Sequence, residues 1–545
     1  MKHTSVLDCT LRDGAYLVDK KFGEGTIKGI IEGLLLTGID FIEIGFFQND
    51  GFGEGKTVYK NSADAKKYVP QDKQGSIFTV LADYSRYDIR NLDERTPDSI
   101  DAVRACFFKE ERTAVIDFCK QIKERGYLLF IQPVDILGYT DKEILELIET
   151  INPLEPYCFS IVDTFGSMDL DDLQRIFYLI NNNLSGGIKL GFHSHNNMQM
   201  SNALSQEFIK RSKNVRDTVI DSTIMGMGRG AGNTPTELLI QFLATKMGYK
   251  YNIDALLDVV DTYMGHIRHQ CNWGYSIPYF IAGGYSAHVN NVAYLTEKNS
   301  IRSKDIRYIL NELGEDDRKR YNYSLLEQTY IDYLKTDIDD SAAMNMLESI
   351  FRGRNVLVIG PGKNTLLYIE KIQAYQKEKN AIVITVNFVS DMITSDYMYL
   401  NNIRRFDLWK NRQEFVKIKK IITSNVILSN QKIENSLVVN FAKLIRNGWT
   451  YVDNSVVMLL RLLDFFHVAS IGLAGVDGYS DGGNDISNYL FSEMESDKVQ
   501  HDSRQLNKEI GMMINDFIKT RNSKCPVVFI TPTKLIDTGV EEMCF

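Results

Sequence analysis

The amino-acid sequence predicts an α/β protein: an N-terminal TIM (β/α)8 barrel with a helical extension, then a C-terminal Rossmann-like open α/β domain. Apolar, β-rich runs alternate with segments of helical period up to residue 222. Residues 251–350 have a helical pattern, and strand-like runs return after residue 353. Strands that alternate with helices are typical of parallel sheets.

Eight runs are the expected barrel strands. They span residues 5–9, 41–45, 76–81, 102–108, 128–134, 158–162, 188–193 and 218–222. Helical segments such as residues 113–125 and 170–181 separate them. Eight parallel strands with intervening helices close into a barrel, and a doubly wound open sheet is the alternative arrangement.

The length of 545 residues exceeds what one hydrophobic core supports, so we expect more than one domain. The barrel is expected at residues 1–290, a helical extension or linker at 291–352, and the Rossmann-like domain at 353–545. A glycine-rich interruption of the helical pattern is expected at residues 281–285. The second domain is expected to open at residues 353–362, where an apolar strand runs into a glycine-containing turn and then a helix. Its further strands are expected at residues 381–387, 424–428, 470–474 and 527–530.

The composition favours a soluble protein with a small-molecule substrate. Hydrophobic residues make up 44% of the chain and charged residues 24%, and the net charge of −9 disfavours nucleic-acid binding. Seven cysteines without a CxxC pair fit the reduced thiols of a cytoplasm, where we expect the protein to reside. No run approaches the roughly 18 apolar residues of a membrane span.

Polar residues gather at the expected C-terminal ends of the first, seventh and eighth barrel strands, which closure makes neighbours. Asp13 follows the first strand, and His193 and His195 end the seventh. Residues two apart on an extended segment face the same way, so both imidazoles can face one ion. This donor set predicts a divalent metal site with positions left for a bidentate substrate; Mn²⁺ is favoured, with Mg²⁺, Co²⁺, Zn²⁺ or Fe²⁺ as alternatives. A chance pair of histidines, with Asp13 as a helix cap, is the other interpretation.

Arg12 precedes the expected ligand Asp13. A guanidinium beside a metal-held 2-oxo acid can stabilise developing enolate charge, so we expect Arg12 to be catalytic. Glu43 lies on a strand that ends at the same rim and is a second candidate catalytic residue. The alternatives for Arg12 are a surface position or a structural ion pair with Glu43.

Five motifs follow one another in the first half of the chain: Leu-Arg-Asp-Gly at 11–14, Phe-Ile-Glu-Ile-Gly at 41–45, Val-Asp-Thr-Phe-Gly at 162–166, Gly-Phe-His-Ser-His-Asn-Asn at 191–197 and a glycine-rich segment at 226–237. In this order they resemble the DRE-TIM metallolyase (HMGL-like) superfamily, which includes 4-hydroxy-2-oxovalerate aldolase, hydroxymethylglutaryl-CoA lyase and isopropylmalate synthase. The resemblance implies metal ligands at Asp13, His193 and His195 and enolate stabilisation by Arg12. Asn233 matches a position that completes the metal sphere in some branches, and turn formation in its glycine-rich loop is the alternative.

The sequence departs from the aldolase branch at Tyr16, where that branch carries an acid/base histidine. An unperturbed phenol has a pKa near 10 and is a poor base at neutral pH. Tyr275 lies about where the family has a second active-site tyrosine. Both tyrosines are candidate catalytic residues.

The resemblance implies cleavage or formation of a 4-hydroxy-2-oxo acid, with pyruvate and an aldehyde as the small-molecule partners. Claisen condensation of an acyl-CoA with a 2-oxo acid is one alternative, and a degenerate barrel with a binding role is another. The helical segment could dock a partner, including a second copy of the chain, or pack against its own barrel.

Four short motifs in residues 353–545 resemble bacterial sialyltransferase-like and pterin-diphosphokinase-like proteins. They lie at residues 358–364, 386–388, 454–477 and 529–535. A glycine turn that opens a helix can cradle phosphate, which makes Gly360 and Gly362 candidates, although such turns are also plain tight connections. The resemblance implies a cytidine nucleotide or nucleotide sugar as partner, contacted by Asn387, with Asp477 and His501 as further site residues. Asp477 as a turn cap, His501 at an exposed helix start, and a domain that has lost its chemistry are the alternatives.

Overall fold

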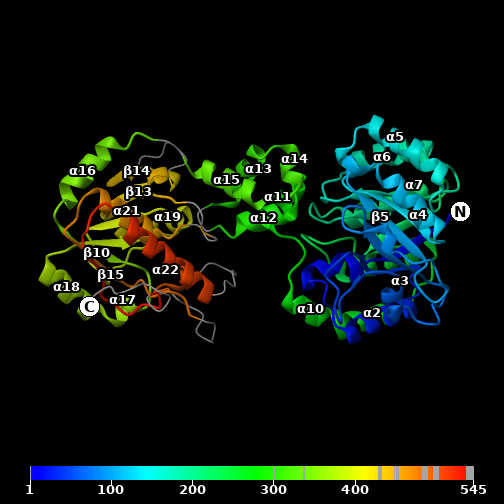
Figure 1. Ribbon diagram of the computed structural model, residues 1–545, viewed down its shortest axis with the longest axis horizontal. Coiled ribbons are helices and arrows are strands. Elements are labelled where there is room, and N and C mark those ends of the chain that lie inside the picture. Colours follow the sequence, from blue (N-terminus) through cyan, green and yellow to red (C-terminus); the bar gives the residue numbers. More distant parts are fainter. Residues whose placement is uncertain are drawn as a thin grey trace. The chain divides into compact units, whose positions relative to one another are not determined.

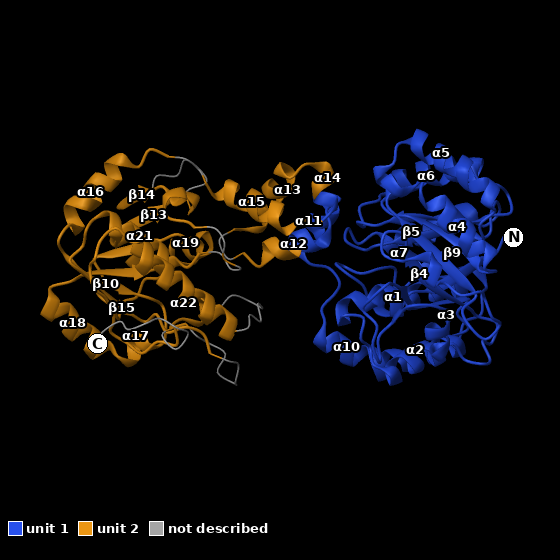
Figure 2. Cartoon of the chain, viewed as in Figure 1, with its two compact units in different colours: residues 1–292, 318–320 blue, residues 293–317, 321–545 orange. Residues whose placement is uncertain are grey.

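The structure is a computed structural model that describes residues 2–298, 301–335, 338–426, 433–446, 449, 453–480, 489–494 and 503–535. The chain divides into two compact units (Figure 2). Unit 1 comprises residues 1–292 and 318–320, and unit 2 comprises residues 293–317 and 321–545.

Unit 1 contains a closed parallel barrel (Figure 1). Its strands pair in the order β1-β9-β8-β7-β6-β5-β4-β2, and pairing of β1 with β2 closes the sheet. The short β3 (Val58–Tyr59) adds to the edge of β2. The barrel strands are β1 (Thr4–Asp8), β2 (Phe41–Phe47), β4 (Ile77–Asp83), β5 (Ala102–Phe107), β6 (Leu128–Pro133), β7 (Cys158–Asp163), β8 (Lys189–Ser194) and β9 (Thr218–Ser222). The predicted barrel is confirmed.

Helices follow most of the barrel strands. They are α1 (Thr10–Asp13), α2 (Glu24–Thr37), α3 (Ser62–Ala65), α4 (Val115–Glu124), α5 (Asp141–Ile151), α6 (Leu170–Asn183), α7 (Ser201–Ser212) and α8 (Thr236–Met247). Further helices follow the barrel: α9 (Ile253–Val259), α10 (Gly265–Gln270), α11 (Ile277–Gly284), α12 (Val289–Thr296), α13 (Ser303–Glu312), α14 (Glu315–Lys319), α15 (Tyr323–Leu334) and α16 (Ser341–Phe351).

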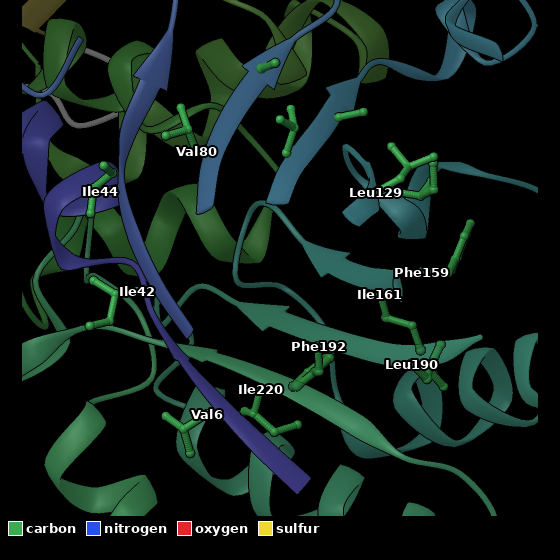
Figure 3. Packing of buried hydrophobic residues seen from close by; sticks show 14 of the residues in the cluster. Val6, Ile42, Ile44, Val80, Leu129, Phe159, Ile161, Leu190, Phe192 and Ile220 are labelled. Atoms are coloured by element: carbon green, nitrogen blue, oxygen red, sulfur yellow. The ribbon is translucent and has the colours of Figure 1, made fainter. Parts of the chain in front are cut away.

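Side-chain alternation along the strands separates two buried faces of the barrel sheet. One set of alternate positions packs in the large apolar core (Figure 3); it includes Val6, Ile42, Ile44, Val80, Leu129, Phe159, Ile161, Leu190, Phe192 and Ile220. The other set forms a small apolar cluster that includes Leu7, Phe41, Phe130 and Val219. Glu43, Arg104 and Asp221 each lie two residues after a member of this cluster, namely Phe41, Ala102 and Val219. They therefore share the face of this second cluster. Polar groups thus line the second face toward the C-terminal ends of the strands.

Unit 2 contains an open, fully parallel sheet with the strand order β14-β13-β12-β11-β10-β15-β16. Its strands are β10 (Asn355–Ile359), β11 (Ile382–Val386), β12 (Tyr397–Leu400), β13 (Lys419–Thr423), β14 (Ser436–Val439), β15 (Ser470–Ala474) and β16 (Val527–Phe529). Its helices are α17 (Asn364–Leu367), α18 (Ile369–Lys379), α19 (Ile403–Trp409), α20 (Gln413–Lys417), α21 (Ser455–Phe465) and α22 (Ser503–Thr520). The predicted Rossmann-like sheet is confirmed.

The strand predicted at residues 424–428 is wrong. Strand β13 ends at Thr423, and Ser424–Val426 forms a 3-10 turn; residues 427 and 428 lie outside the described residues. Side chains end the strand, because Ser424 Oγ accepts the Phe441 amide and Asn425 Nδ2 donates to the Asn401 carbonyl. Strands β12 and β14 were not predicted from the sequence.

The glycine-rich interruption predicted at residues 281–285 is also wrong, because helix α11 continues through Gly284. A Cβ atom at Gly283 would lie 2.9 Å from Met198 Cγ and 3.0 Å from Asn197 Cβ. Gly283 therefore permits close packing against the loop after β8. Among the described residues, no helix has the length and apolar character needed to cross a membrane.

Candidate active site

Three expected ligands meet at the C-terminal end of the barrel. Asp13 ends the buried helix α1, which follows β1 directly, while His193 lies in β8 and His195 just after it. Asp13 Oδ2 lies 3.5 Å from His193 Nε2 and 3.7 Å from His195 Nε2. One ligand atom from each residue lies within 4.8 Å of the others, a spacing that suits a single metal ion. The structure thus brings together residues that are far apart in the sequence.

The donor atoms fit a divalent cation. Asp13 Oδ2 is buried and receives no hydrogen bond. Burial favours the neutral acid, but Arg12 and the two histidines hold the pKa of Asp13 well below its usual value. Burial lowers the pKa of His195 to about 4, so its imidazole is neutral and can donate an electron pair. An ionised carboxylate beside two imidazoles is a donor set that divalent transition metals bind.

A second group, Cys9, His193 and Asp221, also has the spacing of a metal site and shares His193 with the first. Burial raises the pKa of the Cys9 thiol well above its usual value, and Cys9 Sγ donates to the Ser222 carbonyl. A protonated thiol is a poor ligand, so the first group is the better candidate.

His193 is oriented by a carboxylate behind it. Its Nδ1 atom lies 2.9 Å from Asp221 Oδ2. Asp221 also pairs with Arg104, whose side chain is only 1% exposed. Burial favours the neutral acid, but Arg104 and His193 lower the pKa of Asp221. An ionised partner of this kind holds a metal-ligating imidazole in one tautomer and orientation.

Glu43 and Arg12 link Arg104 to the candidate ligand Asp13. Arg104 Nη1 donates to Glu43 Oε2 at 2.8 Å, and Arg12 Nε donates to the same oxygen at 2.7 Å. Arg12 Nη1 lies 3.3 Å from Asp13 Oδ1. The contacts close a circuit of buried side chains that runs through His193, Asp221, Arg104, Glu43, Arg12 and Asp13. The ion pair considered for Arg12 is present, and it fixes the guanidinium beside a candidate ligand.

The contacts of Asn233 agree in part with metal binding and in part with turn formation, the two roles considered from the sequence. Its Nδ2 atom donates to the Met227 carbonyl at 3.1 Å across the glycine-rich loop, as expected for turn formation. Its Oδ1 atom is buried without a donor, and its backbone pairs with that of His195. A Cβ atom at Gly228 would lie 2.2 Å from Asn233 Nδ2, so the loop needs glycine there. Asn233 is therefore close to a candidate ligand and has an oxygen free to bind.

Tyr16 lies near the circuit, whereas Tyr275 does not join it. Tyr16 packs edge-on against Phe46, and the Arg229 guanidinium lies 3.9 Å from the centre of its ring. Burial raises the pKa of Tyr16. Tyr275 is 62% exposed, just before α11, and none of the described contacts links it to the candidate ligands.

Residues 3–262, which hold all the barrel strands and the histidine pair, match the HMGL-like family model. The barrel is therefore similar to HMGL-like domains. The match covers slightly less than half of the chain and ends before unit 2 begins.

Other proteins are similar to part of this chain. An oxaloacetate decarboxylase of Mycobacterium tuberculosis is 27% identical over 251 residues, covering 44% of this chain and 69% of its own length. A 4-hydroxy-2-oxovalerate aldolase of Carboxydothermus hydrogenoformans is 27% identical over 328 residues, covering 57% of this chain and 92% of its own length. A crystal structure of the N-terminal domain of a candidate aldolase from Bacteroides vulgatus aligns with a TM-score of 0.49 and 23% identity, covering 54% of this chain and 97% of its own length.

The residues expected to bind a nucleotide lie in unit 2, outside the barrel. Gly360 and Gly362 follow β10, and Cβ atoms there would lie 2.5 and 2.6 Å from the Gly475 carbonyl oxygen. Asp477 Oδ2 accepts the Asn364 amide at the start of α17, so the chain itself supplies a carboxylate at this helix start.

Asn387 directly follows β11, and its side chain is engaged within the protein. Asn387 Nδ2 donates to Asn401 Oδ1 and to Ser455 Oγ, both at 2.9 Å. Its Oδ1 atom accepts the Asn401 amide at 3.1 Å. His501 lies outside the described residues. The nucleotide site depends on the sequence resemblance alone and stays a prediction.

Arg104 and Asp221 were not among the candidate residues predicted from the sequence, although both interrupt apolar strands of the barrel. Arg104 stands in Ala-Val-Arg-Ala-Cys-Phe, and Asp221 stands in Thr-Val-Ile-Asp-Ser. A charged residue inside a buried strand requires a partner of opposite charge. That signal was available from the sequence, but the identity of the partners was not.

Proposed function

We propose that the HMGL-like barrel is a divalent-metal-dependent aldolase that cleaves or forms a 4-hydroxy-2-oxo acid through the enolate of pyruvate. The observation that carries this proposal is the convergence of Asp13, His193 and His195 beside the fixed guanidinium of Arg12. These three side chains would hold the cation, and Asn233 Oδ1 is the candidate fourth protein donor.

A bound divalent cation supplies Lewis acidity, which polarises the 2-oxo group and makes the adjacent carbon more acidic. The role of Arg12 follows from its contacts: Glu43 holds Nε and Asp13 lies beside Nη1, so the guanidinium is held rigidly. A guanidinium that is already in position stabilises developing enolate charge without reorganisation during the reaction. Glu43 acts by positioning Arg12 and Arg104.

Tyr16 is suited to donate a hydrogen bond and not to remove a proton. Burial raises its pKa above that of a free phenol, so it stays protonated at neutral pH. The substrate proton therefore leaves by another group or by water. Tyr275 is exposed, and its proposed role requires that substrate binding bring it toward the site.

The similarity to 4-hydroxy-2-oxovalerate aldolases supports the aldol reaction. The similarity to an oxaloacetate decarboxylase supports a second candidate, because loss of carbon dioxide from oxaloacetate generates the same pyruvate enolate. Acyl-CoA condensation and a purely binding barrel remain the alternatives. Nucleotide-sugar chemistry at residues 353–545 and assembly into a homo-oligomer stay predictions.

Proton NMR of pyruvate in D₂O tests the enolate. The Mn²⁺-loaded protein should exchange the methyl protons for deuterium, and His195→Ala should abolish the exchange. His269→Ala is the matched control, since His269 is exposed on α10. Product analysis with oxaloacetate and with 4-hydroxy-2-oxo acids then separates decarboxylase from aldolase. Absence of exchange in the parent protein would refute the pyruvate enolate.

A further inference from the structure

A group of cations lies beside the candidate active site and has no role in the proposed chemistry. Lys20 and Arg229 flank an aromatic pair: Arg229 Cζ lies 3.9 Å from the ring centre of Tyr16, and Lys20 Nζ lies 5.1 Å from that of Phe46. The two rings pack edge-on at 5.2 Å. Tyr16 is three residues beyond the candidate ligand Asp13, so this array is next to the metal site.

The backbone directs Lys20 toward this array. Asp19 and Lys20 both adopt left-handed conformations, with φ of 48° and 60°, which are unfavourable for residues with side chains. The Lys20 amide donates to the Ala15 carbonyl, and the Lys20 carbonyl accepts the Thr57 amide. Lys20 Nζ donates to Gln48 Oε1 at 2.7 Å. A turn held in an unfavourable conformation often serves function, and this one places an ammonium group at the barrel mouth.

In the described part of the chain, no carboxylate lies within ion-pair distance of Lys20 or Arg229. Burial lowers the pKa of Lys20, and the neighbouring Arg86, Lys56 and Arg229 lower it further, against the opposing effect of Asp50. Cations gathered without a matching anion are typical of a site that binds a negatively charged ligand.

The segment after α11 covers the same end of the barrel. Ser286 Oγ donates to Ser167 Oγ in the loop after β7, and a Cβ atom at Gly230 would lie 2.9 Å from Val289 Cγ1. His288 lies between these two contacts. Burial lowers the pKa of His288 to about 3, with contributions from Arg229 and Arg86, so His288 is neutral beside the cations.

We propose that Lys20 and Arg229 form an anion subsite that binds a carboxylate or phosphate group on the aldehyde half of the substrate. This inference rests on the proposed aldolase function and names the substrate class. The metal site and Arg12 bind the 2-oxo acid end, while the subsite binds the anionic group at the other end of the chain. A guanidinium binds either oxyanion through two parallel hydrogen bonds, and an ammonium group adds a point charge. Neutral aldehydes lack this interaction and are poor substrates.

Matched pairs of aldehydes test the preference in the condensation of pyruvate by the full-length, Mn²⁺-loaded protein. Succinic semialdehyde against butyraldehyde tests a carboxylate, and glyceraldehyde 3-phosphate against glyceraldehyde tests a phosphate. We expect kcat/KM to be at least about tenfold higher for the charged member of one pair, the effect of a single charged hydrogen bond. Arg229→Met and Lys20→Met should each reduce this ratio toward one, and Arg229→Lys should retain part of it. Lys28→Met, in an exposed pair with Glu24 on α2, should leave the ratio unchanged.

A binding measurement separates this inference from the aldolase proposal. Oxalate in excess occupies the metal site of the Mn²⁺-loaded protein, and ³¹P NMR then reports the relaxation of inorganic phosphate near the ion. We expect saturable relaxation that weakens at least about tenfold in Arg229→Met, since one charged hydrogen bond is lost. Saturable phosphate binding without exchange of the pyruvate methyl protons would support the anion subsite and refute the aldolase proposal. Pyruvate exchange with equal use of charged and neutral aldehydes, or phosphate binding that is identical in Arg229→Met and the parent, would overturn the subsite.

Discussion

The Nδ1 atom of His193 lies 2.9 Å from Oδ2 of Asp221, and this contact determines which ring nitrogen faces the candidate metal site. The Asp221 carboxylate accepts the Nδ1 proton, so Nε2 is left to face Asp13 at 3.5 Å. Asp221 thus orients His193 in the candidate metal site without being one of the three proposed ligands. The same carboxylate pairs with Arg104, which links the orientation of the histidine to the buried ion pairs of the barrel.

Asp221→Asn should weaken Mn²⁺ binding about 10- to 100-fold, because an amide holds the His193 ring less firmly than a carboxylate does. Isothermal titration calorimetry of the metal-free protein measures the change. Asp217→Asn is the control: Asp217 pairs with Lys2 at the surface, and this change should leave the affinity unaltered. Equal affinities in Asp221→Asn and the parent would show that Asp221 does not support the metal site.

Arg104→Met should lower the free energy of unfolding of the barrel by about 3–5 kcal/mol, because it removes a buried cation shared by two buried carboxylates. Glu43 is then left with Arg12 alone, and Asp221 with His193 alone. The urea dependence of hydrogen exchange in barrel peptides measures this loss. Arg175→Met removes a half-exposed pair with Asp141 and should cost less than about 1 kcal/mol. Similar losses in the two variants would mean that the buried circuit contributes no more than a surface pair.

Tyr16→Phe should leave the pH dependence of pyruvate methyl exchange unchanged, since a buried phenol that stays protonated contributes no titration. The rate itself should fall by no more than about tenfold, which corresponds to one hydrogen bond. Exchange rates measured by NMR from pH 6 to 9 provide the comparison. Loss of the alkaline limb of the profile in the variant would identify Tyr16 as the titrating group.

Asp8 should make the barrel less stable as the pH rises. Burial raises the pKa of Asp8 to about 6, despite hydrogen bonds from Thr236 and Thr10. A carboxyl group whose pKa is higher in the folded state stabilises it below the unfolded pKa near 4, and this contribution is lost as the pH rises through about 6. Two pKa units correspond to about 3 kcal/mol as an upper estimate.

Asp8→Asn should remove this pH dependence, because the amide does not titrate. The difference in unfolding free energy between the variant and the parent, from hydrogen exchange at pH 4 to 8, measures the effect. The variant should gain relative stability between pH 4 and pH 7. A constant difference over that interval would show that Asp8 has the same pKa in both states.

Local sequence patterns were enough to predict the two parallel sheets and to locate the candidate metal ligands. Hydrophobic periodicity located the barrel strands, and the rule that polar groups collect at strand ends placed Asp13, His193 and His195 together. Side-chain spacing along a strand is local, so it can be predicted from neighbouring residues. Side-chain hydrogen bonds to distant backbone groups are not local, and for that reason the strand predicted at residues 424–428 was wrong.

Which charged residues contact one another could not be predicted from the sequence. Alternation indicates that Glu43, Arg104 and Asp221 share a face, but their pairing depends on how the strands are staggered around the closed barrel. The same holds for Lys20 and Arg229, which lie 209 positions apart in the sequence. They lie over the neighbouring rings of Phe46 and Tyr16. Ion pairs across a barrel are long-range contacts, and one sequence read by local rules contains no measure of the distances between such residues.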